Sequence, residues 1–262
     1  MIFLYKKYDV LLKRIVCVCF FVFILFPSNV LAKELIVAVA ANMQYAFAAI
    51  KTIYEEKTGI NIQEVIGSSG QLTAQIQNGA PFHVFISADT KYPQVLYENK
   101  KTLTEPKIYA YGQLVLWTLR DIVLDQELKE LVNERIKKIA LAEPSSAPYG
   151  RQAMTALEKS GLLPLIQDKL IFAQSISQVN QFILSQGADV GFTAKASVLT
   201  VITREQGRWI DIPQKFYEPI AQGCVLLTYA QEHNFNEAMQ FYQFLFSEES
   251  QRILNQFGYR IP

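Results

Sequence analysis

Cysteine and histidine are scarce in this sequence, and their scarcity excludes several classes of site. Two of the three cysteines, Cys17 and Cys19, lie in an N-terminal segment that we expect to be removed, so only Cys224 remains and no internal disulfide can form. The two histidines, His83 and His233, stand at no spacing from cysteines or carboxylates that is typical of a metal site. We therefore expect a fold stabilised by its hydrophobic core and a site without direct cation ligands.

A strongly basic composition is also missing. The formal net charge is +1, and the first 32 residues contribute four basic residues against one acidic residue, so the rest of the chain is near −2. A protein that binds nucleic acid through its phosphates needs a clustered basic face. The charge balance therefore disfavours a nucleic-acid partner.

The longest apolar run is too short to span a bilayer comfortably. It extends from Ile15 to Phe26, follows the basic residues, is broken by Pro27, and is followed by small residues up to Ala32. This order is typical of a secretory signal peptide and predicts cleavage after Ala32. The exported chain would have 230 residues, enough for one large domain or two small lobes, and should be soluble. A retained membrane anchor is the alternative interpretation.

Apolar runs of strand length alternate with helical patterns along the rest of the chain. Residues 34–41 form a continuous apolar run, and Phe47, Ile50 and Tyr54 follow at helical spacing before Gly59. Further strands are predicted at residues 60–66, 84–86, 114–119, 138–142, 190–192 and 225–228. This alternation predicts an α/β fold with mostly parallel sheets.

Four strand-to-helix junctions are small, polar and free of basic residues. They are residues 40–43, the Gly-Ser-Ser-Gly turn at 67–70, residues 141–150 and residues 175–180. In open α/β sheets, ligands bind where strands end and helices begin, and exposed N–H groups at helix starts favour anions. The four junctions therefore predict one anion site built from N–H and O–H donors. An ordinary serine or asparagine cap is the alternative at each junction.

Common catalytic and phosphate-binding motifs are not present. The turn at 67–70 is neither the G-x-S-x-G of a nucleophile elbow nor the G-K-[ST] end of a P-loop. The sequence has no Tyr-Tyr pair, which weakens an interpretation as a protein that captures ferric ions. We expect a binding protein without catalytic residues or cofactor. A secreted α/β hydrolase with a Ser–His–acid site remains the alternative from a different class, and it would depend on Ser68 or Ser69.

Several segments resemble the periplasmic molybdate-binding proteins of ABC transporters, and they occur in the same order as in that family. They are VAVAAN at 37–42, GSSGQL at 67–72, GAPFHVFISAD at 79–89, LAEPSSAPYG at 141–150, GADVGF at 187–192 and FGY at 257–259. The resemblance implies a two-lobed periplasmic binding protein of type II, in which the lobes close over a tetrahedral oxyanion. It places lobe 1 at residues 33–111 and 225–262, and lobe 2 at residues 112–224.

The resemblance also assigns the ligand-binding residues. Asn42 stands where the family has a serine or asparagine that contacts the anion, and Ser69 matches the serine of the second turn. Tyr149 and Val179 match positions that offer backbone N–H groups, and Ala41 and Ser68 are secondary candidates. The expected ligand is molybdate, and also tungstate, with an ABC transporter permease as partner and a monomeric protein in the periplasm.

Ala194-Lys195 stands where some members carry a binding tyrosine, so the chain resembles the branch of the family that has asparagine in the first loop and lacks that tyrosine. One position departs from the family pattern, because His83 stands where the family usually has aspartate. His83 lies outside the proposed ligand loops. Another tetrahedral oxyanion, such as sulfate, remains an alternative ligand. Phosphate fits less well, because its proton needs an acceptor and the only carboxylate in the loops is Glu143.

Overall fold

Two five-stranded sheets form the framework of the computed structural model, which describes residues 34–205 and 207–262. The predicted signal peptide and its cleavage point after Ala32 lie outside these residues. The first sheet has the strand order β2-β1-β3-β10-β4, with bounds β1 (Glu34–Ala40), β2 (Asn61–Gly67), β3 (Val84–Ile86), β4 (Lys107–Gly112) and β10 (Ile220–Leu226). The second has the order β7-β6-β8-β5-β9, with bounds β5 (Leu114–Thr118), β6 (Ile139–Ala142), β7 (Leu170–Ala173), β8 (Val190–Ala194) and β9 (Arg208–Asp211).

Both sheets are mixed. In each sheet the strands followed by helices pair in parallel, as β1 does with β2 and β3, and as β6 does with β7 and β8. The strands β10 and β5 pair antiparallel to their neighbours. The predicted α/β fold with two lobes is confirmed, but the sheets are mixed rather than mostly parallel, because β5 and β10, at which the chain passes from one sheet to the other, pair antiparallel.

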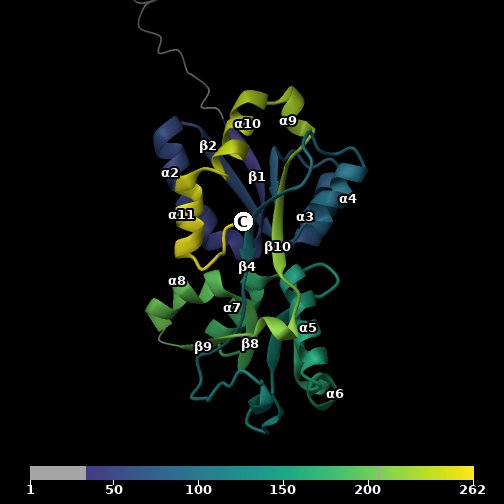
Figure 1. Cartoon of the computed structure of the whole chain (residues 1–262), viewed down its shortest axis with the longest axis vertical. Coiled ribbons are helices and arrows are strands. Elements are labelled where there is room, and N and C mark those ends of the chain that lie inside the picture. Colours follow the sequence, from purple (N-terminus) through teal and green to yellow (C-terminus); the bar gives the residue numbers. More distant parts are fainter. Residues whose placement is uncertain (1–33, 206) are drawn as a thin grey trace, which may run out of the picture. The chain divides into compact units, whose positions relative to one another are not determined.

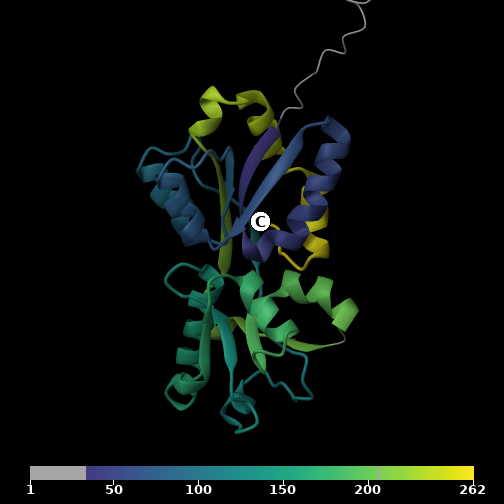
Figure 2. The same cartoon turned by 180° about the vertical axis from the view of Figure 1, so that it is seen from behind.

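Helices cover both faces of each sheet (Figures 1 and 2). Their bounds are α2 (Gln44–Thr58), α3 (Ser69–Gln77), α4 (Lys91–Glu98), α5 (Pro148–Lys159), α6 (Leu163–Ile166), α7 (Ile176–Leu184), α8 (Lys195–Glu205), α9 (Tyr229–Glu232), α10 (Phe235–Phe244) and α11 (Glu248–Gln256). Short 3₁₀ helices lie at η2 (Ala41–Met43), η3 (Lys129–Val132), η4 (Gln167–Lys169) and η5 (Gln214–Phe216). No helix among the described residues has the length and apolar character needed to cross a membrane.

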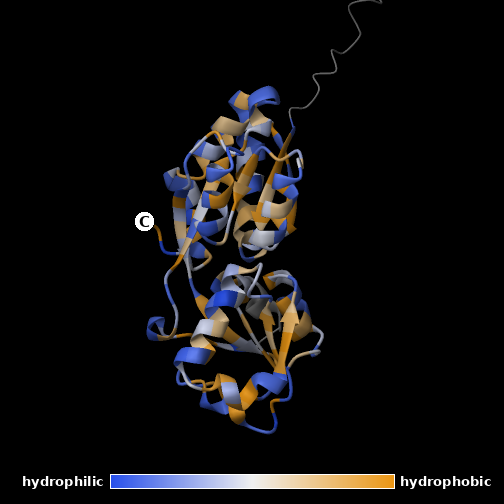
Figure 3. Ribbon diagram, turned by 90° about the vertical axis from the view of Figure 1, so that its right-hand side faces the viewer, coloured by the Kyte–Doolittle hydropathy of each residue, from blue (hydrophilic) through white to orange (hydrophobic). Residues whose placement is uncertain are grey.

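Strand β1 shows why its sequence is apolar on both faces. Leu35, Val37 and Val39 pack with α2, α10 and α11, whereas Ala38 packs with α3 and α4 on the opposite face. Successive side chains of a strand point to opposite faces, so a strand covered on both sides is apolar along nearly its whole length, and in β1 only the first residue, Glu34, is exposed. Figure 3 colours each residue by its hydropathy, and much of the strand ribbon is orange, the hydrophobic end of its scale.

The chain passes between the sheets twice. Only Gln113 separates β4 from β5, and residues 212–219 separate β9 from β10. The strand predicted at residues 225–228 is corrected to β10, which begins at Ile220, because Gly223 and the polar Gln222 obscured its first half. The predicted lobe boundary between residues 224 and 225 therefore falls inside β10, a strand that belongs wholly to the first sheet. Below, the first lobe is the first sheet with its helices, and the second lobe is the second sheet with its helices.

Candidate anion-binding site

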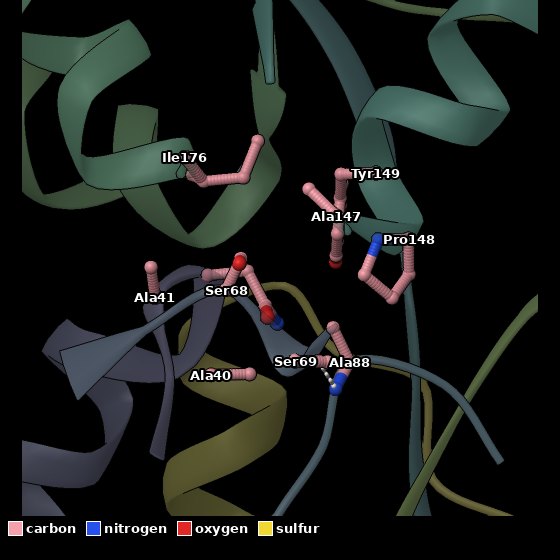
Figure 4. A pocket seen from close by; sticks show the side chains of 10 residues that line it. Ala40, Ala41, Ser68, Ser69, Ala88, Ala147, Pro148, Tyr149 and Ile176 are labelled. Carbon is pink, nitrogen blue, oxygen red and sulfur yellow. Dashed lines mark hydrogen bonds between the residues drawn. The ribbon is translucent and has the colours of Figure 1, made fainter. Parts of the chain in front are cut away.

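All four predicted junctions meet at one small cavity. The first lobe lines it with the starts of η2 and α3 and the end of β3, and the second lobe lines it with the starts of α5 and α7. Figure 4 shows the two groups facing each other across the cavity. The lining residues are Ala40, Ala41, Asn42, Ser68, Ser69, Ala88, Ala147, Pro148, Tyr149 and Ile176.

The cavity has the size of a small ion and no charged wall. The space open to the centre of a water molecule is about 10 Å³. For a sphere, this corresponds to a radius of about 2.7 Å once the radius of water is added. Pockets for drug-sized ligands are far larger, about 300–1,000 Å³. None of the ten described residues that line the cavity carries a charge, so an ion bound here would be stabilised by dipoles rather than by a counter-charge.

Ser69 is held as a hydrogen-bond donor toward the cavity. Its hydroxyl oxygen accepts the backbone N–H of Ala88 at 3.0 Å, the bond drawn in Figure 4. This bond uses a lone pair of the hydroxyl oxygen and not its hydrogen, so the hydrogen can be donated to a ligand. Ser69 is also the first residue of α3, where the backbone N–H has no partner within the helix. One residue therefore supplies two donors.

Ser68 caps the same helix. Its hydroxyl accepts the backbone N–H of Gln71, whose side chain accepts the backbone N–H of Ser68, which together form a capping box. Ser68 is 3% exposed and lines the cavity, so its own hydroxyl hydrogen can also reach a ligand. The cap and the binding role predicted for this turn are therefore compatible.

The start of α5 offers backbone donors from the second lobe. Pro148 occupies the first helical position, where its missing N–H costs nothing, and Tyr149 follows it. The N–H of Tyr149 belongs to the first turn and has no partner within the helix. Its side chain is 1% exposed and is directed away from solvent, with the hydroxyl accepting from Gln222 Nε2 at 3.1 Å.

The prediction for Val179 is corrected by the structure. Its backbone N–H donates to the Ser175 carbonyl at 3.1 Å, the first bond inside α7, and Val179 does not line the cavity. Ser175 is the N-cap and its hydroxyl accepts the N–H of Gln178. The unpaired donors of this helix therefore belong to Ile176 and Ser177, and Ile176 lines the cavity. The predicted junction began at Ser175, and recognising this serine as the N-cap would have identified Ile176 as the donor.

Asn42 lines the cavity, but its side-chain donors are directed elsewhere. Its Nδ2 donates to Gln222 Oε1 at 2.9 Å and to the Tyr259 hydroxyl at 3.2 Å. An amide nitrogen has two hydrogens, and these two bonds use both of them. Asn42 can therefore offer a ligand its backbone N–H, in the first turn of η2 next to Ala41, rather than its side-chain amide.

The two lobes touch on both sides of the cavity. On one side, the N–H of Gly70 donates to the Ser146 carbonyl at 2.9 Å and the Tyr92 hydroxyl donates to the Ser145 carbonyl at 2.9 Å. A Cβ at position 70 would lie 2.8 Å from the Tyr92 hydroxyl oxygen and 2.9 Å from Ser146 Cα, so only glycine permits this approach.

On the other side, the Ser177 hydroxyl donates to Gln44 Oε1 at 2.5 Å. These contacts, none of which the sequence analysis identified, keep the two halves of the cavity together.

Lys195 and His83, which the family comparison singled out, do not line the cavity. Lys195 forms an ion pair with Asp211 at 3.0 Å, and its ammonium lies over the Trp209 ring. The rings of His83 and His233 both contact the Tyr229 ring, that of His83 edge-on and that of His233 stacked. Because neither described histidine lines the cavity, Ser68 and Ser69 have no base of the kind a Ser–His hydrolase requires. In the part of the chain that the structure describes, no group of three His, Cys, Asp or Glu residues could hold a metal ion.

Known proteins are similar to this chain in sequence and in architecture. The model of the family described as bacterial extracellular solute-binding protein matches residues 35–260. The molybdate-binding protein ModA of Rhodobacter capsulatus is 36% identical over 229 residues, which are 87% of this chain and 88% of that protein. ModA of Azotobacter vinelandii is 34% identical over 229 residues, 87% of this chain and 90% of that protein. The structure of the periplasmic molybdate-binding protein of Azotobacter vinelandii superimposes with a TM-score of 0.82 at 32% identity, covering 87% of this chain and all of that one.

Proposed function

Because the chain belongs to the bacterial extracellular solute-binding proteins, we propose that it captures molybdate in the cavity between its lobes and delivers it to an ABC transporter. In this family the protein binds a solute rather than transforming it, which agrees with the expectation of no enzymatic activity. We place the working protein in the periplasm as a monomer, exported by the predicted signal peptide, without cofactor.

The observation that carries the proposal is the cavity lined by helix starts and free of charged side chains. Helix N-termini stabilise an anion through free N–H groups and the helix dipole. The donors we assign are the hydroxyls of Ser68 and Ser69 and the backbone N–H groups of Asn42, Tyr149 and Ile176. No lining residue is a carboxylate that could accept a proton from the ligand, so a fully ionised oxyanion suits the site better than a protonated one.

Molybdate is favoured over other tetrahedral anions by the relatives at 34–36% identity, which are named for molybdate binding. Tungstate has the same charge and nearly the same shape, and we propose that it binds as well. Sulfate shares the charge but is smaller. Donors held by backbone and buried side chains cannot follow a smaller ion inward, so its hydrogen bonds would be longer and weaker.

Calorimetric titration of the purified mature protein tests the proposal. We expect one molybdate per chain and competition by tungstate at the same site, with much weaker binding of sulfate. Elemental analysis of the protein as purified from a molybdate-containing culture provides an independent measurement. Absence of heat with every oxyanion, together with no bound molybdenum, would contradict the proposal.

A further inference from the structure

Gln222 is a buried polar residue at the centre of a hydrogen-bond network beneath the cavity. It is 0% exposed and lies on β10, where a bulge between Gln222 and Gly223 interrupts the pairing with β4. Its Oε1 accepts hydrogen bonds from Asn42 Nδ2 at 2.9 Å and from the Tyr109 hydroxyl at 2.7 Å. Its Nε2 donates to the Tyr149 hydroxyl at 3.1 Å. A bulge re-aims a side chain, and here the re-aimed carboxamide accepts two hydrogen bonds at Oε1 and donates one from Nε2.

Two of these three partners belong to helix starts that line the cavity, one in each lobe. Asn42 is in η2 of the first lobe, and Tyr149 is in α5 of the second. Gln222 does not line the cavity. We propose that Gln222 is a positioning residue that fixes the backbone N–H donors of Asn42 and Tyr149 relative to each other, and so sets both the affinity and the size selectivity of the anion site. This inference rests on the function proposed above.

The network has no freedom to rearrange around Tyr149. A Cβ at Gly112, the last residue of β4, would lie 2.0 Å from the Tyr149 hydroxyl oxygen and 2.4 Å from Gln222 Nε2. The phenol and the carboxamide are thus packed directly against the backbone at which the chain first passes between the sheets. The bond between them ties the start of α5 to this crossing, rather than to a flexible surface element.

Asn42 is fixed from a second direction as well. The Tyr259 hydroxyl donates to the Asn42 carbonyl at 2.9 Å while accepting from its Nδ2. Burial raises the pKa values of Tyr109, Tyr149 and Tyr259 above the ordinary value, so all three phenols stay protonated at neutral pH. The network is therefore neutral, and it orients the donors without bringing a negative charge near the anion.

A substitution at 222 should loosen the donors while leaving the fold intact. In Gln222→Met, a chain of similar length replaces the amide. Tyr109 keeps an alternative acceptor in the Ser87 carbonyl at 3.2 Å, and Asn42 keeps Tyr259. We expect molybdate affinity to fall about tenfold, with a smaller fall for sulfate, because the larger ion depends more on the exact spacing of the donors.

Thr118→Val is the matched control for lost stability. The Thr118 hydroxyl donates to the Asp189 carbonyl at 2.6 Å in the second lobe and is also fully buried, but no residue of that pair lines the cavity. It should lower the melting temperature of the ligand-free protein and leave both anion affinities unchanged. A merely structural role of Gln222 would make the two variants behave alike.

Tyr149→Phe removes the same bond from its other end and covers the case in which Gln222→Met fails to fold. We expect a loss of about threefold in molybdate affinity, and a double variant that loses less than the product of the two single losses, because both act on one bond. If neither the molybdate affinity nor the sulfate affinity differed between the wild-type protein, Gln222→Met and Tyr149→Phe, this inference would be overturned while the proposed function would stand. A wild-type protein that binds no oxyanion would instead overturn the proposed function, and this inference with it.

Discussion

Arg151 Nη2 and Asp89 Oδ2 lie 2.8 Å apart and join the two lobes beside the anion cavity. Asp89 follows β3 in the first lobe, and Arg151 is in α5, two residues after Tyr149. The guanidinium also donates to the Pro144 carbonyl at 3.1 Å, and the carboxylate accepts the N–H of Tyr92. The pair is well shielded, with 31% and 18% of the side chains exposed. This ion pair can therefore stabilise the contact between the lobes, although neither residue lines the cavity.

Arg151→Gln should weaken anion binding without removing any group that lines the cavity. The variant loses an ion pair that stabilises the form in which the two lobes are in contact, and this pair is worth up to about 1 kcal/mol. If the anion binds poorly when the lobes are apart, this loss corresponds to about a fivefold increase in the dissociation constant. Calorimetric titration with molybdate measures this loss. Repeating the titration of the wild-type protein in high salt should move it part of the way toward the variant, since salt screens partly exposed pairs.

Arg208→Gln is the control for the loss of a positive charge. Arg208 pairs with Asp121 at 2.6 Å, but the side chains are 58% and 91% exposed and both belong to the second lobe. We expect no change in molybdate affinity. If Arg208→Gln weakened binding as much as Arg151→Gln, general electrostatic attraction rather than the contact between lobes would be responsible.

Ser69→Ala should reduce molybdate affinity by one to two decades. The variant loses a hydroxyl donor to a charged ligand, worth about 1.5–3 kcal/mol, while the backbone N–H of the same residue remains. Titration of Ser69→Ala beside Tyr149→Phe ranks the two donors, and the serine variant should lose more, because the tyrosine acts through its backbone. Ser160→Ala, at the far end of α5, removes a hydroxyl that donates to the Leu157 carbonyl at 3.0 Å and does not line the cavity, and it serves as the control. The reverse ranking would mean that the donors are wrongly assigned.

The sequence located the cavity well because its four walls are local features. Each junction follows an apolar strand, and two of the four carry a serine N-cap, so Ser68, Ser69 and the start of α5 could be predicted from the sequence alone. Val179 was assigned from the family resemblance, and the donor that lines the cavity lies three residues earlier, at Ile176. A cap residue identifies the next N–H groups as unpaired, and that rule leads from Ser175 directly to Ile176.

The network under the cavity could not be predicted in this way. Asn42 and Gln222 are 180 residues apart, and Asn42 and Tyr259 are 217 apart. No local sequence pattern predicts that a glutamine on a strand is buried. Because Gln222 is polar, the hydropathy of the sequence did not indicate a strand in the first half of β10. The pairing of Asp89 with Arg151 has the same origin, since it exists only where the two lobes meet.

Melting temperatures with added anions should separate molybdate from sulfate. A ligand that binds only the folded protein raises stability by about 4 kcal/mol at a thousandfold excess over its dissociation constant. We expect a clear upward shift with molybdate or tungstate and a much smaller one with equal sulfate or phosphate. The physical reason is the fixed spacing of the donors around the 10 Å³ cavity. Equal shifts from sulfate and molybdate would contradict the proposed selectivity, even if all of these anions bind.

His83 should make the protein less stable in mild acid. Burial is the main cause that lowers its pKa below the ordinary value, and its Nδ1 accepts the N–H of Ile36 at 3.0 Å, which requires the unprotonated nitrogen. As pH falls below about 6.5, the unfolded chain binds a proton that the folded protein resists, so the free energy of unfolding decreases. His83→Asn keeps an acceptor near Ile36 but cannot be protonated. Urea unfolding between pH 5 and 7.5 should therefore show a shallower pH dependence for His83→Asn, and identical slopes in both proteins would exclude His83 as the source of the acid sensitivity.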